Sequence, residues 1–249
     1  MIILKSSLEI ERMKGPCQIV SETLELLRQK IKPGITTLSL DQFAESHARK
    51  SLAVPAFKGY SGYPFSLCCS VNNQVVHGFP TNIELQSGDI LSIDFGVVFD
   101  GFYGDAAITV AVGSVDKNAS ALINVTEEAL YKGIEKALVN NNLSDISAAV
   151  QQHAEKNGFS VVREFVGHGI GRSLHESPQI PNFGKPGRGV KLKQGMVFAI
   201  EPMINEKGPE VRVLSDGWTA VTIDGGLSAH FEHTVAITVN GPEILTKIN

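Results

Sequence analysis

Four carboxylates and one imidazole stand where the surrounding sequence predicts buried β-strands. Each lies within or at the end of a short apolar run, such as SIDF, DAAITV or MVFAIE. They are Asp94, Asp105, His168, Glu201 and Glu232. Because an ionised carboxylate loses favourable hydration on burial, it needs a cation or several hydrogen-bond donors beside it. These positions are therefore the first candidates for metal binding and catalysis.

The segment SIDFGVVFDGFYGDAAITVAVG, residues 92–113, predicts a β-hairpin that carries two of these acids. Its Asp100-Gly101 pair favours a type I′ turn, which requires positive φ at both central residues. In that register Gly96 lies opposite Asp105, and Asp94 is a diagonal neighbour of Asp105 on the same face, with backbones about 7–8 Å apart. We expect Gly96 to leave open space between the carboxylates. Either the pair faces solvent at a sheet edge, or one acid is protonated, or a cation lies between them.

An internal repeat aligns the candidate residues across the two halves of the sequence. LQSGDILSID matches LKQGMVFAIE without gaps, DAAITVAV resembles EHTVAITV, FKGY parallels FVGH, and HGFP parallels HESP, in the same order in both halves. The repeat pairs acid with acid and histidine with histidine: Asp94 with Glu201, Asp105 with Glu232, and His77 with His175. It predicts two similar halves about a pseudo-twofold axis, which would bring these residues to one central site.

The chemistry of such a site follows from its charges. Four carboxylates carry four negative charges, which two divalent cations would balance. Oxygen ligands with one imidazole suit Mn²⁺, Fe²⁺ or Co²⁺, and Zn²⁺ is an alternative. A pair of such ions lowers the pKa of a shared water and so supplies a hydroxide nucleophile near neutral pH. The residues therefore predict hydrolysis at a dinuclear metal centre.

Helix pairs followed by antiparallel strands predict the α+β fold that positions these residues. Ser7 is the expected cap of the first helix, and Pro16 is expected to kink that helix or to delay its start. We expect a central antiparallel sheet flanked by the helix pairs. The expected helices are Ser7–Lys30, Ser39–Leu52, Ala119–Asn140 and Asp145–Lys156, and the expected strands are Ile90–Phe99, Phe102–Val112, Val161–Val166, Met196–Ile200 and Ser228–Val239.

Composition limits the class of protein. The chain has 249 residues, of which 43% are hydrophobic, and a net charge of −4. It contains no basic run suited to DNA, no apolar run long enough to span a membrane, and no signal peptide at its N-terminus. Three cysteines without a CxxC motif fit a reducing compartment. We therefore expect a cytoplasmic protein with neither DNA nor membrane as a partner. We also expect it to be a monomer, which composition does not test.

The ordered motifs HGFP, SIDFG, GHGIG, HESP, AIEPM and FEHTVAIT resemble those of the type I methionine aminopeptidases, which have the pita-bread fold. The likeness runs from about Ser7 to the C-terminus, and it matches the short bacterial form, which lacks an N-terminal extension and the helical insertion of type II enzymes. It implies one catalytic domain over residues 1–249, with pseudo-symmetric halves at about 7–113 and 118–239. It also implies co-translational removal of the initiator methionine before a small second residue.

The resemblance further implies how the ligands divide between two metal ions. Asp94 would bind one ion, and His168 and Glu201 would bind the other. Asp105 and Glu232 would bridge the two. In the family this arrangement activates the water that attacks the first peptide bond.

Three residues would take part in the reaction itself. Glu201 would act as general base and then as general acid, His175 would stabilise the oxyanion, and His77 would contact the scissile amide. An apolar pocket suits a methionine thioether, which offers dispersion and little hydrogen bonding. The residues that map to the family's pocket are Phe57, Tyr60, Tyr63, Cys68, Leu174 and Trp218.

The sequence departs from the commonest bacterial pattern at two of these positions and at one position beside the metals. Phe57 stands where a cysteine is usual, Leu174 where an aromatic residue is usual, and Gly96 where a threonine is often found. The first two changes exchange bulk across the pocket, so we expect selectivity for methionine to survive. Asn72 and Ser228 match positions that hold a monovalent cation in the family.

The resemblance implies the N-terminal methionine of peptides and nascent chains as substrate, and a transient contact with the ribosome. One alternative is a proline-directed pita-bread peptidase, whose large N-terminal domain does not fit before Phe57. Another is a non-catalytic pita-bread binding protein, in which we would expect an eroded ligand set. Here every ligand position and both active-site histidines are intact.

Several other residues have simpler interpretations. His47 and His153 are expected on solvated helix faces. His230 and His233, which flank Glu232, are expected behind the ligands or at the surface. Trp218 is either part of the pocket rim or an exposed loop aromatic.

Overall fold

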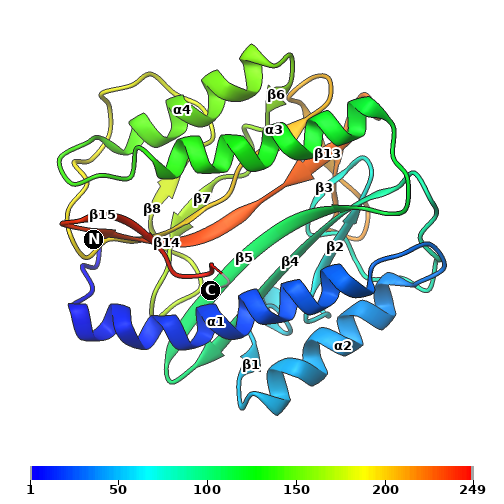
Figure 1. Ribbon diagram of the computed structural model, residues 1–249, viewed down its shortest axis with the longest axis horizontal. Helices are drawn as coiled ribbons and strands as arrows, with labels where there is room; N and C mark the ends of the chain where they lie inside the picture. Colours follow the sequence, from blue (N-terminus) through cyan, green and yellow to red (C-terminus); the bar gives the residue numbers. More distant parts are fainter. Residues whose placement is uncertain (1, 248–249) are drawn as a thin grey trace.

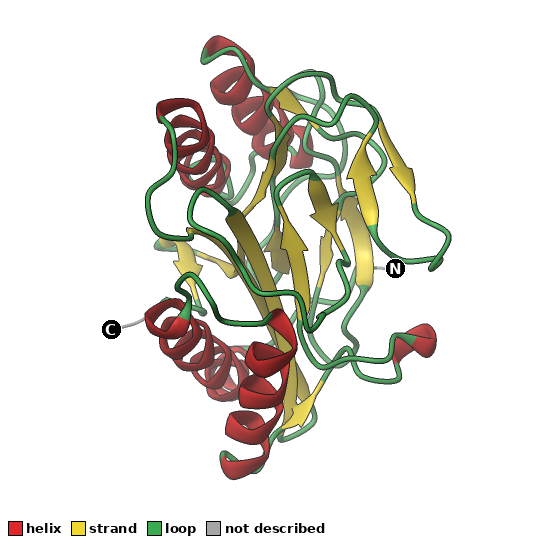
Figure 2. Ribbon diagram, turned by 90° about the vertical axis from the view of Figure 1, so that its right-hand side faces the viewer, coloured by secondary structure: helices red, strands yellow, loops and turns green. Residues whose placement is uncertain are grey.

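The computed structural model describes residues 2–247, in which four α-helices cover one face of a nine-stranded antiparallel sheet (Figures 1 and 2). This arrangement confirms the expected α+β class. The first two helices precede the hairpin in the sequence, and the last two follow it. The helical segments are α1 (Ser7–Lys30), α2 (Thr37–Lys50), α3 (Lys117–Ile134) and α4 (Leu143–Lys156), with a short 3-10 turn η1 (Tyr60–Gly62).

Helix α1 starts one residue after its true cap. The Ser6 side chain accepts from the Glu9 N–H at 3.3 Å, and the Glu9 carboxylate accepts from the Ser6 N–H at 3.0 Å. This reciprocal capping box makes Ser6 the N-cap, so the prediction of Ser7 was wrong by one position. The helix continues through Pro16, so of the two effects expected of this proline the late start was wrong.

Helix α3 ends earlier than its sequence pattern predicts. The expected helix ran to Asn140, but the observed one ends at Ile134 and residues 135–140 form turns. In these turns the Asn140 N–H donates to the carbonyl of Leu192, and Asn140 itself has a φ of 73°. Directly after the helix, the N–H groups of Lys136 and Ala137 donate to carbonyls three residues back, so the chain leaves the α-helical pattern before it reaches Asn140.

The central sheet joins strands from both halves of the sequence, in the order β1-β4-β5-β14-β9-β7-β8, with β2 on β4 and β15 on β14. The repeat aligned β4 with β9 and β5 with β14, so the aligned strands lie symmetrically about the β5–β14 junction. The strands are β1 (Val54–Pro55), β2 (Cys68–Val71), β3 (Gln74–Val76), β4 (Ile90–Phe99), β5 (Phe102–Ala111), β6 (Ser160–Val161), β7 (Gly167–Gly169), β8 (Glu176–Ile180), β9 (Val197–Ile200), β10 (Met203–Asn205), β11 (Val211–Val213), β12 (Ala220–Thr222), β13 (Ser228–His230), β14 (Glu232–Thr238) and β15 (Gly241–Ile244).

Two expected strands differ from the structure. The expected strand Ser228–Val239 is divided at Phe231, because β13 pairs with β10 in a separate three-stranded sheet while β14 pairs with β5 and β9. The expected strand Val161–Val166 is reduced to Ser160–Val161, which pairs with β10. In both cases the chain changes partners at a point that its apolar pattern does not mark.

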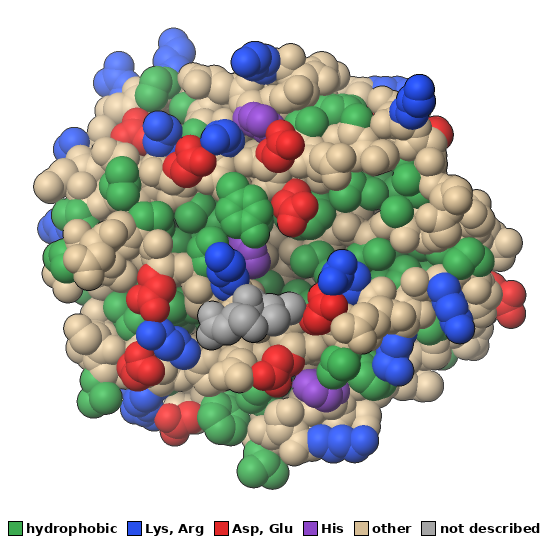
Figure 3. Space-filling view, viewed as in Figure 1, with side chains coloured by type: hydrophobic (Ala, Val, Ile, Leu, Met, Phe, Trp, Pro, Cys, Tyr) green, Lys and Arg blue, Asp and Glu red, His purple; other side chains and the backbone are tan. Residues whose placement is uncertain are grey.

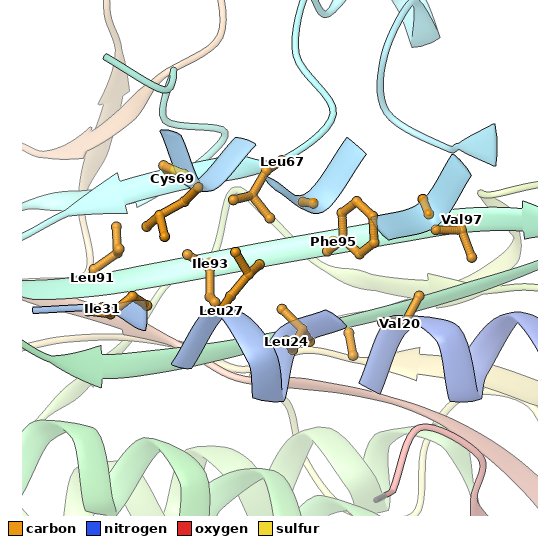
Figure 4. Packing of buried hydrophobic residues seen from close by; sticks show 14 of the residues in the cluster. Val20, Leu24, Leu27, Ile31, Leu67, Cys69, Leu91, Ile93, Phe95 and Val97 are labelled. Carbon is orange, nitrogen blue, oxygen red and sulfur yellow. The ribbon is translucent and has the colours of Figure 1, made fainter. Parts of the chain in front are cut away.

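Alternation along β4 separates the core from the opposite face of the sheet. Alternate residues from Leu91 to Val97 are buried against α1 residues such as Leu24 and Leu27 (Figure 4). Asp94 lies between them in the sequence and therefore faces away from the helices. The same holds for Asp105 on β5. The hairpin thus presents its acids to the face that the helices leave open.

A glycine lets α1 lie close against the hairpin. A Cβ atom on Gly104 would lie 2.7 Å from the backbone nitrogen of Cys17. Any larger residue would push the helix outward, so Gly104 fixes the approach of α1 beside Asp105.

The helix-covered face carries Lys and Arg residues interspersed with Asp and Glu (Figure 3). No single sign of charge dominates this face. Among the described residues no helix combines the length and apolar character needed to cross a membrane.

Candidate metal centre and active site

A cavity of about 540 Å³ opens on the face of the sheet away from the helices. All of the residues that the sequence nominated for metal, catalysis or the substrate pocket line it. Carboxylates and imidazoles form one part of its wall, and aromatic and aliphatic side chains form another. The folded chain therefore brings the whole predicted set to one place.

The hairpin has the predicted register. Gly96 lies opposite Asp105, and the turn residues Asp100 and Gly101 have φ values of 50° and 76°. Asp100 points away from the cavity and accepts from Arg12 Nε at 2.7 Å. Of the three acids in this segment, two face the cavity and the third anchors the turn.

The space above Gly96 is filled, contrary to expectation. A Cβ atom on Gly96 would lie 2.9 Å from Cε1 of Phe57 and 3.1 Å from Oδ1 of Asp105. The ring of Phe57 thus occupies the room that the glycine leaves beside the carboxylates. The large residue at position 57 and the small one at position 96 are complementary in shape.

Two groups of three side chains have the spacing of metal ligands, and Glu232 belongs to both. Within each group, one nitrogen or oxygen from every residue lies within 4.8 Å of the others. The groups are Asp105, His168 and Glu232, and Glu201, His230 and Glu232. Asp94 faces the same cavity from β4.

The donor atoms of this cluster suit hard divalent cations. One oxygen each of Asp94, Asp105 and Glu232 is buried and has no hydrogen-bond partner among the described residues. Buried oxygens without donors are rare and costly, and bound cations would satisfy them. The residues present therefore fit a pair of divalent ions.

His168 has the hydrogen bonding of a metal-binding histidine. Its Nδ1 contacts the carbonyl of Gly169 at 2.9 Å, which places the proton on Nδ1 and leaves the Nε2 lone pair free. Nε2 lies 3.5 Å from Oε1 of Glu201. Burial lowers the pKa of His168 to about 3, so the ring is neutral, as a ligand must be.

His230 was expected behind the ligands or at the surface, and it lies buried among the ligand side chains. It is 2% exposed, its Nε2 has no hydrogen-bond partner among the described residues, and that atom lies 3.6 Å from Oε2 of Glu201. Glu201 therefore lies between two imidazoles, one beside each oxygen. The spacing of His230 and Glu232, two residues apart in an apolar run, was the signal that could have found it.

His77 and His175 both line the cavity. His77 has a φ of 59°, and its ring meets Trp218 and Phe165 edge-on at centroid distances of 6.1 and 5.5 Å. His175 Nδ1 lies 2.7 Å from the hydroxyl of Tyr60. Aromatic neighbours thus hold both rings in place. The backbone of His77 has a positive φ, which is strained for a non-glycine residue.

The apolar part of the cavity belongs to one core cluster that includes Phe57, Tyr63, Cys68 and Leu174. Trp218 packs on this cluster and meets Tyr63 edge-on at 5.1 Å, so it is a wall of the pocket rather than a surface aromatic. Tyr60, which is 40% exposed, lies at the cavity mouth.

The remaining predicted positions lie outside the cavity. The Ser228 N–H donates to the Asn72 carbonyl at 2.9 Å, which brings the two expected cation ligands together. Asn205 pairs with Ser228 across the strands, and its side-chain oxygen is buried without a partner among the described residues. His47 contacts Thr23 Oγ1.

The other two histidines also have partners away from the cluster. His153 contacts a carboxylate oxygen of Glu128 at 2.9 Å. His233 contacts the Thr246 hydroxyl at 2.9 Å. Neither ring lines the cavity.

Burial changes the proton affinity of the carboxylates. It raises the pKa of Asp94 to about 7, and it raises the pKa values of Asp105, Glu201 and Glu232 well above their ordinary range. Repulsion between the acids adds to the effect at Asp105 and Glu232. Without cations the folded protein therefore retains protons that the unfolded chain releases.

This retention predicts opposite pH dependences with and without metal. Between about pH 7 and pH 8 the stability of the chelated protein should fall by about 1 kcal/mol or more per pH unit, because its folded state binds more protons than its unfolded state. The five histidines whose pKa values are lowered oppose this trend only in part, because the unfolded chain protonates a minor fraction of each above its ordinary pKa. With saturating Mn²⁺ the stability should instead rise with pH, because protons compete with the metal. Denaturant titrations at several pH values measure both slopes, and a chelated protein that gains stability with pH would contradict the expectation.

Known proteins share this chain's sequence over its whole length. The model of metallopeptidase family M24 matches residues 11–239. A methionine aminopeptidase of Clostridium perfringens is 60% identical over 248 residues, and methionine aminopeptidase 1 of Bacillus subtilis is 50% identical over 248 residues, in each case with 100% of both chains covered.

Solved structures show the same fold. The methionine aminopeptidase of Thermotoga maritima has a TM-score of 0.98 and 48% identity, with 100% of both chains covered. A prolidase of Pyrococcus furiosus has a TM-score of 0.81, but it is 23% identical and this chain covers 66% of it, so that likeness shows the fold alone. The expected pita-bread fold is confirmed. The chain belongs to metallopeptidase family M24, and its full-length relatives in that family are methionine aminopeptidases.

Proposed function

We propose that this chain removes the N-terminal methionine of proteins whose second residue is small, by hydrolysis of the first peptide bond. One observation carries the proposal: an oxygen-rich ligand cluster and an apolar aromatic pocket meet in the same cavity. The cluster suits metal-assisted hydrolysis, and the pocket suits an unbranched thioether side chain. Full-length relatives that are named methionine aminopeptidases support this assignment.

The ligands would divide between two divalent ions. Asp94 would bind one ion, and His168 and Glu201 would bind the other. Asp105 and Glu232 would each contribute to both. When bound, such ions polarise a carbonyl and lower the pKa of a water. Mn²⁺, Fe²⁺, Co²⁺ and Zn²⁺ all fit a set of carboxylates with one imidazole. The protein's contribution is to hold the four acids at fixed positions on rigid strands.

Glu201 is the proposed proton carrier. Its carboxylate stands at the end of β9 with an imidazole beside each oxygen, and burial raises its pKa well above the ordinary range. A carboxylate at this place would accept a proton from water and return it to the leaving amine. His175 would donate to the oxyanion and His77 to the scissile amide. Burial lowers the pKa of His77 to about 4, so that ring is neutral at physiological pH.

The methionine side chain would occupy the apolar part of the cavity. Phe57, Tyr63, Cys68, Leu174 and Trp218 would surround it, with Tyr60 at the mouth. The exchange of bulk between positions 57 and 174 keeps the pocket apolar. We expect methionine to remain the preferred first residue.

The substrates would be nascent chains in the cytoplasm. The enzyme would act on them as a monomer, with a transient contact to the ribosome. The described cysteines, Cys17, Cys68 and Cys69, are buried and free, as in a reducing compartment. A monovalent cation would lie near Asn72 and Ser228, where the unpartnered oxygen of Asn205 adds a third candidate ligand.

Removal and return of metal test the function. Chelation should abolish cleavage of Met-Ala-Ser, and Mn²⁺, Fe²⁺ or Co²⁺ should restore it. Met-Lys-Ser should be cleaved at least about 100-fold less efficiently, because a long second residue does not fit beside the ligands. Activity that survives chelation, or a preference for Ala-Pro, would point to another function. Release of free methionine is the measured quantity.

A further inference from the structure

The loop that carries His175 is attached to the N-terminal segment by a buried ion pair. Lys5 Nζ lies 2.6 Å from Oε2 of Glu176, and the two side chains are only 4% and 7% exposed. The Lys5 backbone is fixed as well, because its N–H donates to the Gly195 carbonyl at 2.7 Å. A residue near the start of the chain thus lies directly beneath an active-site loop.

Glu176 uses its second oxygen to close that loop. Oε1 accepts from the N–H groups of Arg172 and Ser173 at 2.8 and 3.3 Å, so the turn folds back on the residue that follows His175. A Cβ atom on Gly171 would lie 2.8 Å from Oε1 of Glu176 and would collide with the Lys5 side chain. The lysine stem therefore passes through space that only glycine at position 171 leaves free.

The position of this loop decides where the His175 ring lies. The ring packs edge-on against His168 at a centroid distance of 4.4 Å, and Nδ1 contacts the Tyr60 hydroxyl. With Nδ1 held by the hydroxyl, the opposite ring nitrogen is the one available to a substrate. A small shift at Glu176 would move the ring from both neighbours.

We propose that Lys5 is a positioning residue for His175 and acts through Glu176. Loss of the lysine charge would leave the buried Glu176 carboxylate without a counter-charge. The carboxylate would then move towards solvent, and the loop that carries His175 would move with it. Misplacement of a reacting group by about 1 Å can cost about 100-fold in rate. The inference rests on the role proposed above for His175.

The chain offers a matched control pair. Arg172 Nη2 lies 3.1 Å from Oε1 of Glu9, and this contact joins the same loop to helix α1. Its side chains are 56% and 29% exposed, so it is a surface pair of little energetic weight. Removal of this surface pair tests whether the loss of any contact between the His175 loop and the N-terminal part of the chain would displace His175.

The experiment compares Lys5→Met, the double variant Lys5→Met/Glu176→Gln, and Arg172→Gln. Lys5→Met should lower kcat for Met-Ala-Ser by about 10- to 100-fold with KM within about 3-fold, and should lower Tm by about 10 °C. In the double variant the glutamine carbonyl can still accept from the turn, so most of kcat and Tm should return. Arg172→Gln should match the unsubstituted protein in both.

A second readout does not depend on metal or on turnover. The ring ¹⁵N resonances of His175 in the chelated protein should shift in Lys5→Met, return in the double variant, and stay unchanged in Arg172→Gln. A Lys5→Met protein with unchanged kcat and unchanged His175 resonances would overturn the proposal, however much its Tm falls. If the unsubstituted enzyme fails to cleave, the proposed function fails, while the resonances still test the loop.

Discussion

Glu201→Gln is expected to lower kcat for Met-Ala-Ser by about 1,000-fold, because the amide can neither accept nor return a proton. Glutamine keeps the size of the side chain and one oxygen towards His168, so the variant should fold. Because the lost charge also weakens the metal site, kcat is measured at saturating Mn²⁺. Stopped assays of methionine release give kcat, and elemental analysis gives the metal content of the same sample.

Glu127→Gln is the matched control, since Glu127 is an exposed residue of α3 outside the cavity. It should leave kcat within about 2-fold of the unsubstituted value. A Glu201→Gln enzyme with full metal content and nearly full kcat would remove the proton-transfer role from this residue.

Asp105→Asn is expected to reduce metal binding as well as rate. Asp105 is 4% exposed, one of its oxygens has no partner among the described residues, and it shares a ligand group with His168 and Glu232. Loss of its charge leaves three carboxylates for two divalent ions. Since changes beside metal ligands already cost about 10- to 100-fold, loss of a ligand should cost at least about 100-fold in affinity.

Asp100→Asn supplies the control for this second substitution. It changes an acid in the same hairpin that binds Arg12 at the exposed turn. Calorimetric titration with Mn²⁺ should show a weakened site in Asp105→Asn and an unchanged one in Asp100→Asn. Equal stoichiometry, affinity and rate in both variants would show that Asp105 does not bridge the ions.

Local rules predicted the hairpin accurately. The Asp-Gly turn and a period of two residues set the register that places Gly96 opposite Asp105. The repeat predicted which strands would lie symmetrically about the centre. Both signals are contained in short stretches of sequence, which is why they could be interpreted without a structure.

Features that depend on distant partners could not be predicted in this way. Phe57 fills the space above Gly96 from nearly forty residues away in the sequence. The division of the last long strand at Phe231 follows from a second sheet that accepts β13. His230 reaches the ligands only through that change of sheet. In each case tertiary packing, and not local preference, decides the outcome.

The junction between β5 and β14 has a consequence for how the molecule holds together. Among the described residues, β5 and β14 are paired in register at Glu232 with Ala107 and at His233 with Ala106, and the Thr234 hydroxyl donates a hydrogen bond to the carbonyl of Asp105. One half supplies two acids to the cluster and the other half supplies the remaining two. Cations bound at this junction would therefore link the two halves of the molecule, which few backbone hydrogen bonds join there. Amide hydrogens along this junction should exchange slowly when the cations are bound. They should exchange faster once the cations are removed, before either half unfolds.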